Sequence, residues 1–226
     1  MSFVVTVTTL EKEMAMADDA STWKFIHAER AELADLIAGL TAEQWRAPSL
    51  CSGWSVGVLA AHILAAAEQT PGHFVGGILS SGLRFNAFMD KDARARGTLT
   101  PVQVAERLNA RTNTTNKPPA PTQAMLGEVV IHGEDLRRPL GLRHDSPAEA
   151  LNACLESATK ANFPVGGKKR IAGLTLVATD TGWSVGSGPD VRGPATDLLL
   201  AMTGREAGLA GLAGAGLETF ASRVRS

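Results

Sequence analysis

The chain has 226 residues, with 22 Lys and Arg against 23 Asp and Glu, and 44% of its residues are hydrophobic. This composition is typical of a globular protein and excludes a disordered or collagen-like chain. The net charge of −1 provides no field that would attract nucleic acid or an anionic membrane, so we expect neither as a partner. Cys51 and Cys154 lie far apart and form no CxxC pair, which is typical of reduced thiols in a cytoplasmic protein.

Residues 1–21 show no helical periodicity, and we predict a weakly ordered leader there. This segment lacks the basic start, long apolar core and cleavage site of a secretory signal. The longest apolar run, Val56–Ala67, is too short to span a bilayer. We therefore predict a cytoplasmic location.

Helical patterns dominate the next part of the chain, residues 22–145. Apolar residues recur at three- and four-residue intervals, and Ser, Thr, Pro and Gly mark the starts and ends of the segments. We predict bundle helices at residues 21–40, 55–70, 100–111 and 122–138, and a further interrupted helix at 74–89.

The character of the sequence changes near residue 146. Here we predict a helix capped by Ser146, a β-hairpin, a helix opened by Gly193-Pro194 and a closing helix, at residues 147–160, 171–188, 195–205 and 207–224. The predicted fold is mainly α: an up-and-down four-helix bundle over residues 22–145, followed by a smaller C-terminal α/β domain over 146–226.

Three residues in the predicted bundle form a candidate metal site. His62 lies within an apolar helix, and Glu128 and His132 are four residues apart, so they share one face of another helix. Two imidazoles and one carboxylate are a ligand set of catalytic zinc, with a fourth position open. The same set also suits iron, manganese or nickel, so the identity of the metal stays open. The alternative is a structural one, in which His62 is a hydrogen-bonded core residue and Glu128 pairs within its helix.

The segments PSLCSGWSVGVLAAHIL, GEVVIHGEDLRRPLG and ATDLLLAMTGR together resemble the mycothiol-dependent maleylpyruvate isomerase family, of the DinB/YfiT-like metalloprotein superfamily. The resemblance runs from about Trp23 to Arg205. It implies a DinB-like bundle with a divalent metal, usually zinc, at the positions of His62, Glu128 and His132. It also implies that the arginine of the TGR motif, here Arg205, serves the active site as a catalytic residue.

The resemblance further implies an enzyme whose cosubstrate is mycothiol, the low-molecular-weight thiol of actinobacteria. A metal-bound thiol loses its proton near neutral pH and becomes a nucleophile for an unsaturated acid. Addition followed by elimination gives an isomerase, and addition alone gives an S-transferase. The alternative class is a non-catalytic metal- or ligand-binding protein, a sensor or a dimerising scaffold, because fold alone does not establish chemistry. The true substrate and the presence of a homodimer stay open.

Three further residues near these motifs have two interpretations each. Trp54 is the candidate cofactor-binding residue, with the alternative that it braces its loop. Asp135 is a candidate acceptor that orients an imidazole, with the alternative of a solvated charge. Cys51 is a candidate ligand or redox thiol, but with no basic neighbour in the sequence it is better explained as a small packed residue.

Overall fold

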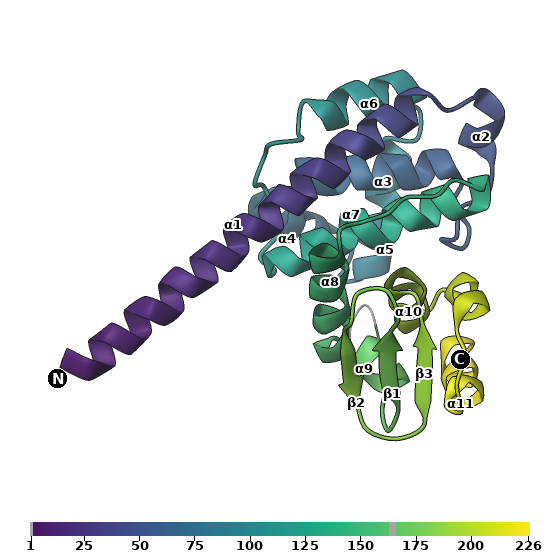
Figure 1. Cartoon of the computed structure of the whole chain (residues 1–226). Coiled ribbons are helices and arrows are strands. Elements are labelled where there is room, and N and C mark those ends of the chain that lie inside the picture. The colour runs from purple at the N-terminus through teal and green to yellow at the C-terminus, as the bar shows by residue number, and fades with distance from the viewer. Residues whose placement is uncertain (1, 163–165) are drawn as a thin grey trace. The chain divides into compact units, whose positions relative to one another are not determined.

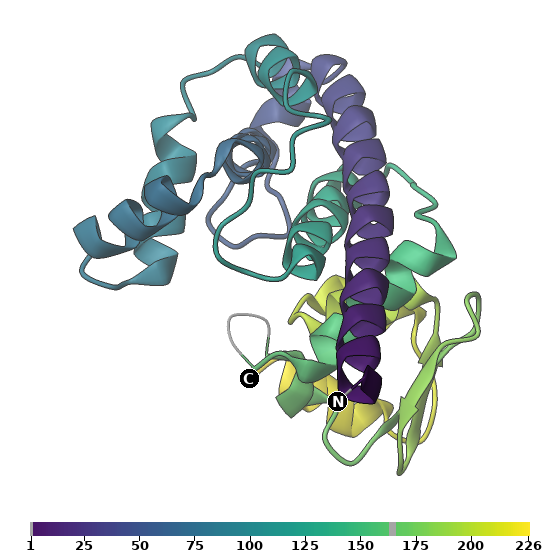
Figure 2. The same ribbon diagram turned by 90° about the vertical axis from the view of Figure 1, so that its left-hand side faces the viewer.

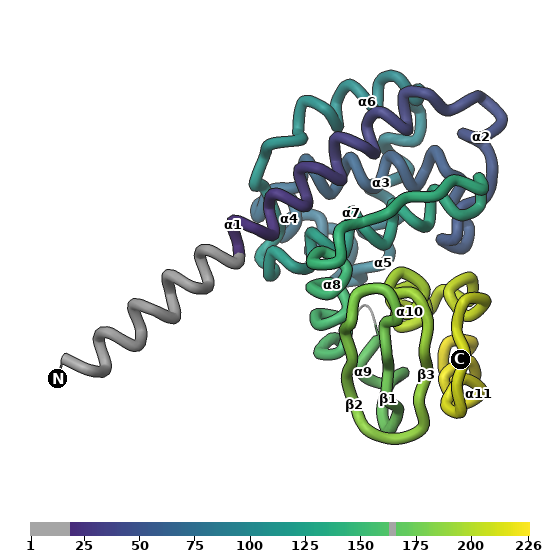
Figure 3. The backbone as a smooth tube through the Cα atoms, in the orientation of Figure 1, coloured from purple at the N-terminus to yellow at the C-terminus, as the bar shows by residue number. Residues whose placement is uncertain are grey.

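The computed structural model of the chain describes residues 2–162 and 166–226, and it describes side chains from Asp19 onward in these ranges. The chain forms two compact units, Met1–Leu136 and Arg137–Ser226 (Figure 1). The boundary therefore falls at the end of the last bundle helix, before the change in composition near residue 146. Figure 3 traces the path of the backbone.

The named secondary-structure elements of the N-terminal unit are all helices over its described residues. In it α1 packs against α6, and α3 packs against α5 and α6 (Figures 1 and 2). The four predicted bundle helices correspond to α1, α3, α6 and α7, and α2, α4 and α5 lie between them in the chain. The bounds are α1 (Ser2–Ala38), α2 (Ala42–Arg46), α3 (Val56–Glu68), α4 (Pro71–Ser80), α5 (Phe85–Ala95), α6 (Pro101–Asn109) and α7 (Thr122–Arg137).

The first helix begins earlier than the periodicity predicts. The expected start is Ser21, whereas α1 begins at Ser2. Residue 1 and the side chains of residues 2–18 lie outside those that the structure describes. The weak order of the leader therefore stays a prediction.

Side-chain caps explain where several bundle helices begin. The Ser55 hydroxyl accepts a hydrogen bond from the Val58 N–H at the start of α3. Thr100 and Gln103 form a reciprocal capping box at the start of α6, with Pro101 in the first turn. These contacts satisfy backbone N–H groups that have no partner within a helix. The predicted starts at Ser55 and Thr100 are confirmed.

The core of the N-terminal unit is aliphatic and closely packed. Almost all of α3 is buried, which agrees with its apolar sequence on every face. The largest fully buried aliphatic side chains of this unit are Ile26, Leu33, Ile37, Leu59, Ile63, Leu64, Leu108, Leu126 and Leu136. Burial of their apolar surface stabilises the folded state by about 25 cal/mol per Å². Polar side chains on α3 and α7 are therefore held in a rigid frame.

The C-terminal unit combines a small sheet with helices. The strand order is β2-β1-β3. Leu176 of β1 lies opposite Val185 of antiparallel β2 and opposite Val191 of parallel β3. The bounds are η1 (Arg138–Leu140), α8 (Ala148–Lys160), α9 (Gly167–Arg170), β1 (Thr175–Ala178), β2 (Ser184–Gly186), β3 (Asp190–Gly193), α10 (Ala195–Met202), η2 (Glu206–Gly211) and α11 (Leu217–Val224).

The predicted hairpin is present in this unit, but two other predictions are wrong. The closing helix is divided into η2 and α11, because Gly214 between them has a φ of 124°, which a helix cannot accommodate. Pro147, and not Ser146, occupies the N-cap position of α8. Strand β3 was not predicted, since its four residues carry little alternation.

The predicted fold class is confirmed, with a mainly helical chain and a small three-stranded sheet. Over residues 2–162 and 166–226 the structure contains no helix with the length and apolar character needed to cross a membrane.

Candidate metal centre

The loop between α2 and α3, residues 47–55, is closed by its own hydrogen bonds. The Ser49 N–H donates to the Trp54 carbonyl at 3.0 Å, and the Val56 N–H donates to the Ala47 carbonyl at 2.9 Å. The Ser49 hydroxyl lies 2.9 Å from the same Trp54 carbonyl. These bonds fix Cys51 and Trp54 relative to the start of α3.

His62 lies in the middle of α3, two turns after this loop, and only 7% of its surface is exposed. Its neighbours Ala61 and Ile63 are also buried. A buried imidazole is costly unless its nitrogens have partners. The position therefore demands a polar group from another helix.

Helix α7 supplies that group. Glu128 and His132 lie one turn apart on the same face of α7, as the four-residue spacing predicts. Val129 and Val130, between them, are buried and anchor the helix in the core. The two functional side chains are thus held against α3 by packing along the same helix.

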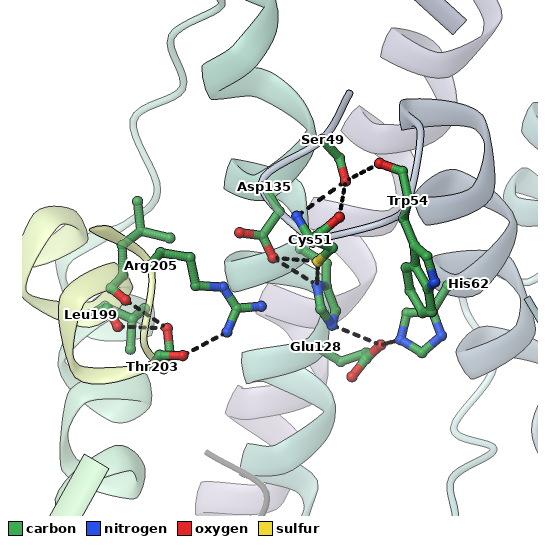
Figure 4. Close-up of polar contacts among 11 residues, drawn as sticks. Ser49, Cys51, Trp54, His62, Glu128, Asp135, Leu199, Thr203 and Arg205 are labelled. Carbon is green, nitrogen blue, oxygen red and sulfur yellow. Dashed lines mark hydrogen bonds and ion pairs between the residues drawn. The ribbon is translucent and has the colours of Figure 1, made fainter. Parts of the chain in front are cut away.

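The structure brings His62, Glu128 and His132 together, and Figure 4 shows His62 beside Glu128. The Glu128 Oε1 atom lies 2.6 Å from His62 Nε2 and 3.6 Å from His132 Nε2. The two imidazole rings meet edge to face with centroids 5.0 Å apart. One ligand atom from each residue lies within 4.8 Å of the others. Two nitrogens and one oxygen at this spacing fit a divalent cation that binds all three.

Two opposing effects act on the pKa of His62. Burial lowers the pKa of His62, but the charge of Glu128, its hydrogen bond and the charge of Asp92 together raise that pKa above its ordinary value. The carboxylates thus favour a positive charge at the imidazole. A cation between Glu128 and the two histidines would satisfy the same field.

Trp54 lies against this cluster. Its ring packs on the His62 ring with centroids 5.0 Å apart, and its indole N–H donates to Asp90 Oδ1 at 2.9 Å. Arg94 binds the same carboxylate and also donates to the Gly53 carbonyl. The indole therefore forms one wall beside His62. A direct role in cofactor binding stays a prediction.

Asp135 and Cys51 lie on the other side of the His132 ring. Asp135 is completely buried, and its Oδ2 atom lies 2.9 Å from His132 Nδ1. The Cys51 thiol donates to the same Oδ2 at 3.2 Å and lies 3.6 Å from His132 Nδ1. The alternative of a solvated charge for Asp135 is therefore wrong. Cys51, Asp135 and His132 also form a second group of potential ligand atoms.

The sequence gives weak or no signals for some residues of this cluster. Cys51 has no basic neighbour along the chain, yet the fold places it beside an imidazole. Asp90 and Asp92 lie on α5, in a segment where no spacing links them to α3. Their proximity to the histidines depends on contacts between segments that are distant in the sequence.

Arg205 lies in the C-terminal unit, between α10 and η2. Its guanidinium donates to the Thr203 carbonyl at 2.8 Å. The pKa of Arg170 is lowered mainly by burial, and the positive charge of Arg205 lowers it further. Thr203 in turn donates its hydroxyl hydrogen to a carbonyl of α10. The side chain is thus held at the end of that helix, and its catalytic role stays a prediction.

Part of the N-terminal unit matches a known protein family. The family model for the mycothiol maleylpyruvate isomerase N-terminal domain matches residues 26–137. That segment contains His62, Glu128 and His132. No curated protein matches the sequence significantly.

Two solved structures share the fold. One is a crystal structure of the mycothiol-dependent maleylpyruvate isomerase, with 15% identity and a TM-score of 0.59. The other is a histidine-to-alanine mutant of a mycothiol-dependent maleylpyruvate isomerase, with 16% identity and a TM-score of 0.58. Each alignment covers 88% of this chain and 92% of the other. Residues 26–137 therefore match the mycothiol maleylpyruvate isomerase N-terminal domain, and the chain shares the fold of the two solved mycothiol-dependent maleylpyruvate isomerases.

Proposed function

We propose that this protein is a divalent-metal-dependent enzyme that uses mycothiol, or a similar small thiol, to isomerise or conjugate a small unsaturated acid. The observation that supports this proposal is the convergence of His62, Glu128 and His132 within a segment that matches a domain of this family. A bundle with only a structural role does not need two imidazoles and a carboxylate aimed at one point.

The donor set favours zinc. Two imidazole nitrogens and one carboxylate oxygen leave one tetrahedral position open, as in catalytic zinc sites. When bound, the cation supplies a site at which a small thiol loses its proton near neutral pH. No cysteine of the chain is then required as the nucleophile.

The residues of the chain have distinct roles in this proposal. His62 and His132 donate lone pairs from Nε2, and the Glu128 carboxylate contributes negative charge from α7. The Trp54 ring covers one side of His62 and limits the access of water there. Arg205 is proposed, from the family resemblance, to bind a substrate carboxylate through its guanidinium. A cytoplasmic location stays a prediction.

The proposed reaction conserves atoms and electrons. The thiolate sulfur forms a C–S bond to one carbon of the C=C bond, and the π electrons move into the conjugated carbonyl group. After rotation about the resulting single bond, the electrons return to re-form the C=C bond as the C–S bond breaks, which gives the isomer and regenerates the thiolate. Protonation of the carbon instead leaves the thiol attached, which is the transferase outcome.

Metal content is the first test. We expect close to one equivalent of zinc per chain by mass spectrometry of the wild type, and its loss in His62→Ala and His132→Ala. His73→Ala is the matched control, because His73 is half exposed on α4 and pairs with Asp92, not with one of the three proposed ligands. Wild type that binds no divalent metal, even after reconstitution, would contradict the proposal.

Thiol-dependent turnover is the second test. We expect consumption of maleylpyruvate or a related unsaturated diacid only when both mycothiol and the metal are present. Arg205→Lys retains the charge but loses the bidentate geometry, so we expect a higher KM for the acid. Metal binding without any affinity for thiols would instead favour a sensor or scaffold.

A further inference from the structure

Two side chains, Asp135 and Cys51, lie at the edge of the His132 ring that faces away from Glu128. Asp135 Oδ2 lies 2.9 Å from Nδ1, and the Cys51 thiol lies 3.2 Å from the same oxygen and 3.6 Å from Nδ1 (Figure 4). The opposite ring nitrogen, Nε2, lies 3.6 Å from Glu128. The two nitrogens of one imidazole therefore have different tasks.

The position of the ring proton follows from the nature of these partners. An ionised carboxylate only accepts hydrogen bonds, and a neutral imidazole carries one N–H and one lone pair. The short contact with Asp135 thus requires the proton at Nδ1. The lone pair is then at Nε2, on the side where His62 and Glu128 converge. Metal-binding histidines commonly have such a partner on their other nitrogen.

The Cys51 loop is attached to the same residue at two points. The Leu50 N–H donates to the Asp135 carbonyl oxygen at 3.0 Å, and the Cys51 S–H donates to its carboxylate. Because Asp135 is completely buried, each donor to its carboxylate lowers the cost of keeping the charge there. The backbone bond fixes the position of the loop, and the thiol fixes the direction of the carboxylate.

We propose that Cys51 is a positioning residue for the metal ligand His132. Its thiol donates to Asp135, which keeps the His132 proton at Nδ1 and the Nε2 lone pair directed at the metal site. This inference rests on the proposed function, because it assigns a task to Cys51 within that same centre. The thiol is neither the nucleophile nor a metal ligand in this arrangement.

A competing arrangement uses the same three groups. A cation bound by Cys51, Asp135 and His132 Nδ1 would take the lone pair of Nδ1. A neutral imidazole has only one lone pair, so it cannot serve both sides at once. The carboxylate contact at 2.9 Å favours the hydrogen-bonded form.

The experiment compares Cys51→Ala, Cys51→Ser and Asp135→Asn with wild type, with Cys154→Ala as the control for loss of a thiol elsewhere. Zinc affinity is measured by competition with a chromophoric chelator. The ring ¹⁵N shifts of His132, assigned with His132→Ala, report which nitrogen carries the proton in metal-free protein. Thermal unfolding establishes that each variant is folded.

We expect Cys51→Ala to weaken zinc binding by about 10-fold and Asp135→Asn by up to about 100-fold, the range found for partners of metal ligands. Both should also increase the Nε2–H form of His132. Cys51→Ser keeps an O–H donor, and we expect it to remain within about threefold of wild type. Cys154→Ala should leave the affinity and the shifts unchanged.

Two results would overturn the inference. One is Cys51→Ala with the zinc affinity and ring shifts of wild type. The other is a second zinc equivalent in wild type that Cys51→Ala alone removes, which would identify Cys51 as a ligand. A wild type that binds no zinc contradicts the proposed function instead, and the ring shifts still decide whether Cys51 positions the proton.

Discussion

Glu68 and Glu128, two carboxylates of the N-terminal unit, illustrate two uses of a partly buried charge. Glu68 ends α3 and binds two guanidinium groups, from Arg96 and Arg107, with contacts of 3.3 and 2.7 Å. Arg107 donates to both oxygens of the carboxylate. This cluster ties α3 to α5 and α6.

Glu128 faces imidazoles instead of guanidinium groups. A guanidinium is always charged and offers only donors, whereas a neutral imidazole also offers a lone pair. The negative charge of Glu68 is therefore balanced by two permanently charged guanidinium groups. In the Glu128 cluster, a carboxylate faces two imidazoles that can each offer a lone pair to a cation, and this is a ligand set. The partner residues, more than the carboxylate, therefore distinguish a structural site from a binding site.

The largest expected effect is on metal affinity. Glu128→Gln replaces an anionic ligand with a neutral amide, so we expect zinc affinity to fall by more than the roughly 10- to 100-fold seen for outer partners. The measurement is chelator competition on the purified protein. Zinc affinity within threefold of wild type would remove Glu128 from the centre.

The second expected effect is on stability. Glu68→Gln leaves two guanidinium groups without their shared anion, and we expect the free energy of unfolding to fall by about 1–3 kcal/mol. Urea denaturation measures this change, and zinc affinity should stay within about threefold of wild type. If Glu68→Gln abolished zinc binding, the distinction between the two clusters would fail.

Local patterns predict the parts of this molecule that local physics determines. Ser55 and Thr100 each bond to a residue three positions further along the chain, so the sequence predicts the starts of α3 and α6. The spacing of Glu128 and His132 is a helical turn, and it predicts their shared face. Local spacing does not predict the position of His62, because only contacts between α3 and α7 bring it to Glu128 and His132.

Other features depend on contacts between segments that are distant in the sequence. Cys51 lies beside His132 because the Leu50 N–H binds the Asp135 carbonyl, a contact between residues far apart in the chain. Strand β3 exists because it pairs with β1. The glycine-rich C-terminal segment has helical spacing, but a Cβ at Gly214 would lie 2.3 Å from the Asp190 carbonyl oxygen. Neither composition nor periodicity reports such contacts.

The smallest expected effect concerns Asp90, which lies on α5 and binds the Trp54 indole. The Trp54 hydrogen bond, followed by that of Arg94, holds the pKa of Asp90 below its ordinary value, despite an opposing effect of burial. A lowered pKa means that the charged carboxylate stabilises the folded state above the unfolded pKa, about 3.9. That contribution is lost as the pH falls through the lower folded pKa.

Asp90→Asn keeps an oxygen that accepts the indole N–H but has no charge, which isolates the ionic part. The carboxylate is 45% exposed, so solvent screening limits its contribution to about 0.5 kcal/mol or less at pH 7. We expect the stability difference between wild type and Asp90→Asn to shrink as the pH falls below 3.9 in urea titrations. A difference of several kcal/mol at pH 7 would place Asp90 with Glu68 among the charges that hold the bundle together. A constant small difference down to the lowest pH would show that Asp90 acts only as a neutral acceptor for Trp54.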